Sequence, residues 1–291
     1  MWLLRFLKSN VLYIIWFLLY FAFAWIILGQ DWRSFYIASA VYGVSITLAL
    51  SPIGEVVLRL LENCRKPATA KEKEYLIPLF EEVYQDAKEF NPSLNNGIKI
   101  YIMDAMYVNA FAIGRKTIAV TKGALETFNR EELKGILAHE LGHMTHGHTK
   151  ALLLTLVGNL FFSLIIWVLR FILSFVEFLA DVTASYNVIG YLFLFIGFLV
   201  RIIFEAFVFL FVNLGQLLLA INSRTNELIA DKFAFQIEYG KQLIDALYLI
   251  QKISINRKLK LSEQLRASHP HTAFRIEALE KLEDKATAVL V

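Results

Sequence analysis

The chain has 291 residues, of which 57% are hydrophobic and 19% are charged. Soluble domains average about 45–50% apolar and about 25% charged residues, so this composition excludes both an ordinary soluble protein and a disordered one. The formal net charge of +3 is too small to indicate nucleic acid as the main partner, and the single cysteine, Cys64, excludes an internal disulfide and a multi-thiolate metal cluster.

Four stretches are long and apolar enough to cross a bilayer as helices, for which about 20 residues are needed. They cover residues 11–29, 35–53, 151–169 and 188–221, and the first three contain no charged residue. The first stretch is longer than the apolar part of a secretory signal peptide, usually about 7–15 residues, so we expect it to remain as an anchor. The sequence therefore predicts two pairs of transmembrane helices, within residues 1–54 and 151–221.

The basic residues indicate how these helices are oriented. Two basic residues precede the first span, and five follow the second span before position 74. Because cytoplasmic flanks of membrane helices are rich in Lys and Arg, we expect the N-terminus and two soluble segments, residues 55–150 and 222–291, on the cytoplasmic side. The connection after the third span carries Arg170, Glu177 and Asp181, is not basic, and is expected on the other side.

Two charged residues, Arg201 and Glu205, lie one helical turn apart within the fourth span. Charge inside a membrane often marks a functional site, for example a transport pathway. A simpler interpretation is that the two side chains pair with each other, or that the helix extends beyond the bilayer. We favour this simpler interpretation, and both remain open on the sequence.

The soluble segments show patterns of both helices and strands. Apolar residues recur every three or four positions from residue 70 to 90, which predicts an amphipathic helix. A second helix is predicted to begin at Arg130, because Asn129 and Glu132 form a capping-box pattern, and to run through His148. Between them, three β-rich runs predict a small sheet in which a hairpin joins the last two runs: residues 98–103, 108–113 and 117–120.

All six histidines lie in two clusters, at positions 139, 143, 146 and 148 and at positions 269 and 271. His139 and His143 are four residues apart on the predicted helix, so both imidazoles lie on one face and can bind one ion. Zn²⁺ accepts imidazole nitrogen and, in catalytic sites, keeps one position for water. Glu140 follows the first histidine and is placed to take a proton from that water. The pattern predicts one zinc ion per chain and a hydrolytic reaction.

A catalytic zinc site needs a third protein ligand, and the sequence leaves several candidates open. His146 continues the series of histidines but lies a further turn along the helix. Carboxylates in the same compartment are the alternative, namely Glu227, Asp231 and Glu238. The extended metzincin pattern is excluded, because positions 146 and 149 are His and Thr rather than Gly and His.

Three motifs together resemble a known family. The run His139-Glu140-Leu141-Gly142-His143 is followed by Ser223-Arg224-Thr225-Asn226-Glu227-Leu228-Ile229-Ala230-Asp231 and by Ser268-His269-Pro270. In this order they resemble the HtpX membrane metalloproteases, relatives of the CAAX prenyl-proteases, over essentially the whole chain. The resemblance implies an α-helical membrane protein with four transmembrane helices plus an α+β zincin-like cytoplasmic domain of the gluzincin type. It also implies that Glu227 is the third zinc ligand and that Asp231 orients a zinc-binding imidazole.

The resemblance assigns roles to further residues. His269 and Arg275 match positions that would stabilise the tetrahedral intermediate or hold the site together. His271 stands where the family has a second proline, which leaves its role open. The segment Asn109-Ala110-Phe111 resembles the family's strand before the zinc helix, along which a peptide substrate would lie through backbone hydrogen bonds. An ordinary hairpin strand is the alternative.

We therefore expect a zinc-dependent endopeptidase in the cell inner membrane, with protein or peptide substrates, the lipid bilayer as a partner and no nucleic acid. The resemblance implies misfolded or damaged membrane proteins as substrates, and a function in the stress response. Three alternatives are a prenyl-protein protease, whose relatives have more spans, a zinc transporter, and a non-catalytic membrane chaperone. Transport is disfavoured because Glu131, Glu132 and Lys134 place the histidine-bearing helix outside the bilayer.

Overall fold

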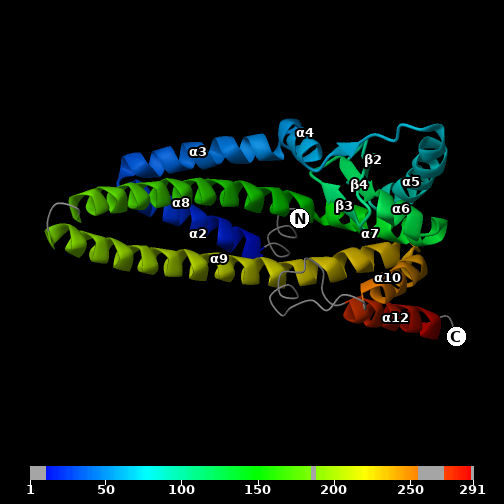
Figure 1. The fold of residues 1–291 in the computed structure, drawn as a ribbon. Coiled ribbons are helices and arrows are strands. Elements are labelled where there is room, and N and C mark those ends of the chain that lie inside the picture. The colour runs from blue at the N-terminus through cyan, green and yellow to red at the C-terminus, as the bar shows by residue number, and fades with distance from the viewer. Residues whose placement is uncertain (1–10, 185–187, 255–271, 290–291) are drawn as a thin grey trace.

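The structure is a computed structural model that describes residues 11–184, 188–254 and 272–289. Four long helices run side by side, α2 (Val11–Leu28), α3 (Trp32–Leu50), α8 (His148–Ala184) and α9 (Val188–Gln236) (Figure 1). The other elements gather at one end of these helices, where a small sheet packs with shorter helices (Figure 1). The fold is therefore mostly helical, with one region of mixed secondary structure.

A buried cluster of aromatic and aliphatic side chains holds the long helices together. The indole of Trp16 lies with its ring centroid 4.7 Å from that of Phe211, which joins α2 to α9. By contrast, α8 and α9 expose many large apolar side chains on their outer faces, among them Trp167, Phe171 and Phe209. Apolar surface of this extent is covered by lipid in a membrane protein. The members of the cluster are Trp16, Tyr20, Ala24, Tyr42, Ile166 and Val208.

Within the described residues, two helical segments are long and apolar enough to cross a bilayer. They are Ser163–Ala184 and Val188–Gly215, with mean hydropathies of 2.0 and 2.4. A third span results if most of α3 and the following α4 (Pro52–Leu61), which meet at a bend of more than 40°, are counted as one. Ile14–Leu28 is a shorter apolar helix. The structure supports a membrane-spanning part, and the count of four spans remains a proposal.

The connection expected after residue 169 is wrong, because helix α8 continues to Ala184 and includes most of that segment. Helix α9 extends from Val188 past the end of the predicted span at residue 221 to Gln236. Arg201 and Glu205 also do not pair with each other. Arg201 binds Glu177 at 2.6 Å and Glu205 binds Arg170 at 2.6 Å, both across to α8. Because α8 presents an oppositely charged side chain to each of them, Arg201 and Glu205 pair across the two helices rather than with each other along α9.

The sheet has four strands in the order β1 (Cys64–Arg65), β2 (Lys99–Met103), β4 (Thr117–Thr121) and β3 (Ala110–Ile113). Strands β3 and β4 form the predicted antiparallel hairpin, which turns at Gly114 with a φ of 59°. Strand β2 pairs with β4 in parallel. Strand β3 begins two residues later than predicted, and neither β1 nor the short helix α6 (Lys122–Thr127) has a counterpart among the predicted elements. The hairpin leaves β3 at the edge of the sheet.

Helix α7 (Arg130–His146) begins as the sequence predicts. The Asn129 side chain accepts hydrogen bonds from the first turn, and the Glu132 carboxylate accepts one from the Asn129 backbone N–H at 2.8 Å, which completes a capping box. The predicted end at His148 is wrong. The helix stops at His146, because Gly147 adopts the left-handed conformation with a φ of 76° and turns the chain into α8.

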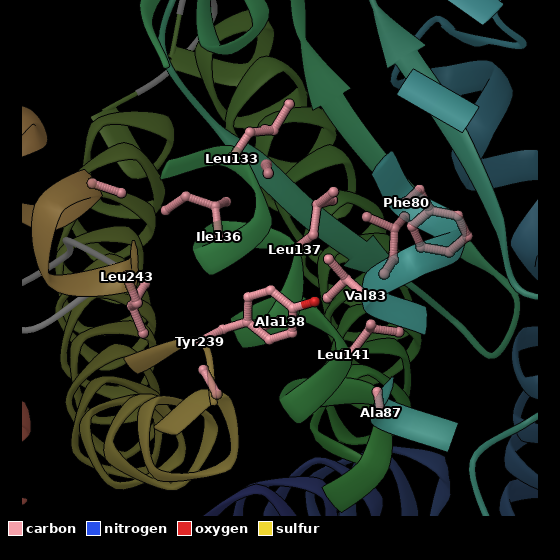
Figure 2. Close-up of a cluster of buried hydrophobic side chains, with 14 of the residues drawn as sticks. Phe80, Val83, Ala87, Leu133, Ile136, Leu137, Ala138, Leu141, Tyr239 and Leu243 are labelled. Atoms are coloured by element: carbon pink, nitrogen blue, oxygen red, sulfur yellow. The ribbon is translucent and has the colours of Figure 1, made fainter. Parts of the chain in front are cut away.

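Helix α7 is held firmly between its neighbours. The predicted helix over residues 70–90 is present as α5 (Ala70–Phe90), and its Phe80 and Val83 pack against Leu137 and Leu141 of α7 (Figure 2). On another side, α10 (Gly240–Ser254) approaches so closely that a Cβ at Gly135 would lie 2.4 Å from a backbone nitrogen. The C-terminal helix α12 (Thr272–Val289) packs on α9 and α10. This packing gives the side chains of α7 fixed positions.

Candidate active site

Helix α7 carries the two histidines of the predicted metal site. His139 and His143 lie one turn apart, and their Nε2 atoms are separated by 3.1 Å. His139 is 3% exposed, which means that its imidazole is almost fully withdrawn from water. The helical spacing of four residues brings both ring nitrogens to a common point, as the sequence predicts.

Helix α9 brings a carboxylate to the same point. Glu227 Oε2 lies 3.3 Å from His139 Nε2, and Glu227 Oε1 lies 3.2 Å from His143 Nε2. The two helices come close enough because Gly142 has no side chain, and a Cβ there would lie 3.0 Å from the backbone of Ala230. Glu227, which lies 84 positions after His143 in the sequence, thus joins the two imidazoles.

The donor atoms fit a zinc ion. Tetrahedral ligands at bond lengths of about 2.0–2.2 Å from Zn²⁺ are separated by about 3.3–3.6 Å. Here the two imidazole nitrogens lie 3.1 Å apart, and each has one of the two Glu227 carboxylate oxygens at 3.2 to 3.3 Å. Two imidazoles and a carboxylate are also a donor set that catalytic zinc sites use. In the ranges that the structure describes, these three residues are the one group of this kind able to hold a metal ion.

The other candidates for the third ligand lie elsewhere. His146 points its Nδ1 at the backbone oxygen of Gly142, 2.9 Å away. Asp231 lies on the far side of His139, at its Nδ1, and Glu238 is exposed beyond the end of α9. The arrangement therefore favours Glu227 over His146, Asp231 and Glu238.

A buried ion pair supports the group from behind. Asp231 Oδ1 lies 2.8 Å from His139 Nδ1, and both Asp231 oxygens accept hydrogen bonds from Arg275 at 2.8 and 2.6 Å. Arg275 Nη1 also lies 3.1 Å from Glu227 Oε2. Burial would raise the pKa of Asp231, but the Arg275 guanidinium and then the His139 imidazole outweigh it and hold that pKa below its usual value. The carboxylate is therefore charged and orients His139.

Glu140 is 5% exposed and follows His139 on α7. Its carboxylate makes no hydrogen bond or ion pair with any side chain in the described ranges, although the charge of Arg275 acts on it. A carboxylate beside a metal site that is not engaged by a structural partner is available to accept a proton.

The structure adds one residue that the sequence did not single out. His148, the first residue of α8, is buried and places its Nδ1 2.9 Å from the Nδ1 of His143. Burial, followed by the neighbouring His143 and His146, lowers the pKa of His148 to about 2, so that this imidazole is neutral. The sequence feature that could have indicated this residue is a histidine directly after Gly147. The turn at Gly147 brings the start of α8 back toward the metal-binding face of α7.

The remaining predicted site residues are the histidines of the second cluster and the proposed substrate strand. His269, like His271, is outside the described residues. Asn109 precedes β3, and its backbone bonds with Thr121 at the hairpin's open end, while Ala110 and Phe111 belong to the strand. Strand β3 contacts α7 and has β4 on one side only, so its other edge pairs with no strand in the described part of the chain.

Comparisons with known proteins identify relatives of the chain. The model of Peptidase family M48 matches residues 70–283. A protein named Protease HtpX homolog from Helicobacter pylori is 29% identical over 223 residues, which cover 70% of this chain and 65% of that protein. One with the same name from Methylacidiphilum infernorum is 25% identical over 281 residues, covering 88% of both chains. The match thus spans less than two thirds of the Helicobacter relatives' length, at 65%.

A solved structure shares the fold. The crystal structure of S. mikatae Ste24p aligns with a TM-score of 0.54 and 20% sequence identity, over 90% of this chain and 61% of that chain. The names of the relatives confirm the resemblance to HtpX that the motifs indicate. Because the family model matches well over half of the sequence, from residue 70 to residue 283, the chain belongs to Peptidase family M48.

Proposed function

We propose that the chain is a membrane-bound, zinc-dependent endopeptidase. The observation that carries this proposal is the convergence of His139, His143 and Glu227 on one point, with donor atoms 3.1 to 3.3 Å apart and Glu140 beside them. One zinc ion held there would supply Lewis acidity, which acidifies a water molecule and offsets charge on the substrate's carbonyl oxygen. Membership of a peptidase family supports a peptide bond as the bond that is broken.

The residues of the chain then have separate tasks. The Glu140 carboxylate takes the proton from the attacking water and later hands it to the leaving amine. Asp231 holds the ring of His139, and Arg275 fixes both Asp231 and Glu227. These contacts support a role of Arg275 in holding the site together rather than in contacting the intermediate. His269 remains a candidate for stabilising the oxyanion.

The substrate is proposed to bind along β3. This strand lies at the edge of the sheet and contacts the helix that carries the histidines. A peptide that adds a strand to an exposed edge is gripped through its backbone, with little dependence on its side chains. Such binding suits misfolded or damaged membrane proteins, whose exposed segments share no sequence.

The membrane arrangement is proposed from the pattern of charge and apolar surface. Residues 1–54 and 151–221 would each supply two spans, while residues 55–150 and 222–291 form the catalytic part in the cytoplasm, in the inner membrane of the cell. The exposed apolar faces of α8 and α9 support contact with lipid. The candidate site lies near the N-terminal end of α8 and in the C-terminal part of α9, where it would act on segments that emerge from the bilayer.

Zinc content and cleavage of an unfolded protein such as casein, measured on the full chain, test this function. Wild type should hold one zinc ion and cleave, whereas Glu140→Gln should keep zinc and lose about 100-fold or more of its turnover. Glu227→Gln should lose both zinc and cleavage. Glu238→Gln makes the same change at an exposed carboxylate of the same region and should keep zinc and cleavage. Unimpaired cleavage by Glu227→Gln, or by Glu140→Gln, would refute the role assigned to that residue. A wild-type chain that binds zinc and cleaves nothing would favour a transporter or a chaperone.

A further inference from the structure

The two histidine ligands are supported in different ways. His139 has the Asp231 carboxylate at its Nδ1, 2.8 Å away. Among the described residues, no carboxylate lies at the Nδ1 of His143. Instead, the Nδ1 of His148 lies there at 2.9 Å. The second ligand is thus backed by an imidazole that belongs to a different helix.

The geometry determines which nitrogen carries the proton. His143 Nε2 faces Glu227 Oε1 at 3.2 Å and His139 Nε2 at 3.1 Å, so it is the nitrogen whose lone pair points to the metal position. A neutral imidazole that offers its Nε2 lone pair carries its hydrogen on Nδ1. That N–H must donate to the Nδ1 of His148, which can accept only if His148 carries its own hydrogen on Nε2.

Packing alone does not explain His148. Its side chain is buried, and its Nε2 has no hydrogen-bond partner among the described residues. Burying a polar nitrogen without a partner costs about 1–3 kcal/mol, so an apolar residue would pack here at lower cost. The bond at the other ring nitrogen is the feature that an apolar residue cannot supply.

Resting on the zinc site proposed above, we propose that His148 is a positioning residue, which accepts the Nδ1 hydrogen of His143 and fixes the tautomer and ring orientation of this ligand. Partners of this kind typically account for a 10- to 100-fold difference in metal affinity. His148 is also the first residue of α8, so His143 is held by a residue at the N-terminus of a helix that is proposed to enter the membrane.

Zinc affinity provides the test, because it can be read without turnover. The full chain in detergent would be titrated with a zinc chelator, and its melting temperature recorded in parallel. His148→Leu removes the acceptor while keeping an apolar side chain of similar size, and should weaken zinc binding about 10- to 100-fold. His148→Asn retains a polar acceptor near the position of Nδ1 and should bind zinc within about threefold of wild type, which is under about 0.7 kcal/mol.

Thr149→Val is the matched control. Thr149 is the next residue, is equally buried and donates a hydrogen bond of 2.7 Å to the backbone of Gly114, but it does not touch a ligand. This variant should lose stability and keep wild-type zinc affinity.

The inference would be overturned if His148→Leu bound zinc as tightly as wild type. It would also be overturned if His148→Asn or Thr149→Val lost as much zinc affinity as His148→Leu. If His148→Leu does not fold, the Asn variant still decides, because zinc loss there contradicts the acceptor role and retention supports it. A wild-type chain that binds no zinc would refute the metal site itself, whereas zinc-binding wild type with an unaffected His148→Leu would refute only the role of His148.

Discussion

The ion pair behind the metal site leads to a quantitative prediction for Asp231→Asn. The substitution keeps the size of the side chain and removes its charge, so that Arg275 loses two hydrogen bonds of 2.8 and 2.6 Å to a carboxylate. Breaking a buried pair costs about 3–5 kcal/mol. Glu227 still lies 3.1 Å from Arg275 and compensates part of that loss. We therefore expect the free energy of unfolding to fall by the lower end of this range, about 3 kcal/mol.

The same substitution should weaken metal binding. An amide oxygen is a poorer acceptor for the His139 Nδ1–H than a carboxylate is, and weakening such a partner lowers metal affinity by about 10- to 100-fold, or about 1.4–2.7 kcal/mol. The assays are thermal unfolding of the zinc-loaded full chain and chelator competition. A loss of about 3 kcal/mol corresponds to a fall of about 6–12 °C in melting temperature.

Asp245→Asn serves as the control, because Asp245 is an exposed carboxylate on α10 and its charge has no buried partner among the described residues. It should change neither the melting temperature nor zinc affinity measurably. If Asp231→Asn behaves like Asp245→Asn in both assays, the contacts of Asp231 do not stabilise the site and the reasoning is refuted.

Further predictions concern the parts that hold the site in place. Glu55→Gln replaces a carboxylate that accepts three hydrogen bonds from the turn of the β3–β4 hairpin and from the first residue of β4. We expect the free energy of unfolding to fall by about 1–3 kcal/mol and, if β3 binds the substrate, KM to rise by more than kcat falls, measured by unfolding and peptide kinetics. Gly135→Ala should lower the melting temperature strongly, because its Cβ would meet backbone at 2.4 Å, whereas Gly43→Ala, with no atom within 4 Å, should not; similar values for both would contradict the packing described. The hydrogen bond from Arg65, and then that from Lys122, lower the pKa of Asp104 to about 2, so its contribution is complete above about pH 4 and is lost as the pH falls through 2. Asp104→Asn should therefore lower the melting temperature slightly at pH 7 and not at pH 2, and a difference that grows in acid would refute this.

Local patterns in the sequence predict the elements that carry the site. The capping residues Asn129 and Glu132 give the start of α7 correctly, and the four-residue spacing of His139 and His143 predicts their shared face. These features depend on interactions within one helix, which a single stretch of sequence contains. The end of α7 is misjudged because the conformation of Gly147 interrupts a pattern that otherwise continues.

Contacts between distant segments could not be predicted in the same way. Nothing near Glu227 indicates that it meets α7, and its assignment came from the resemblance to a family, whereas compartment alone left three carboxylates open. The pairing of Arg201 with Glu177 depends on how α8 and α9 face each other, and therefore on where α8 ends. The role of His148 depends likewise on the turn at Gly147 and on the approach of two helices.

The ion itself provides the most direct test of the account. Anomalous scattering at the zinc absorption edge, from crystals of the Glu140→Gln full chain, would locate any bound zinc. The account predicts one peak, about 2.0–2.2 Å from His139 Nε2, His143 Nε2 and the Glu227 carboxylate. The absence of a peak there, or a zinc ion held by other residues while Glu227 points away, would contradict it.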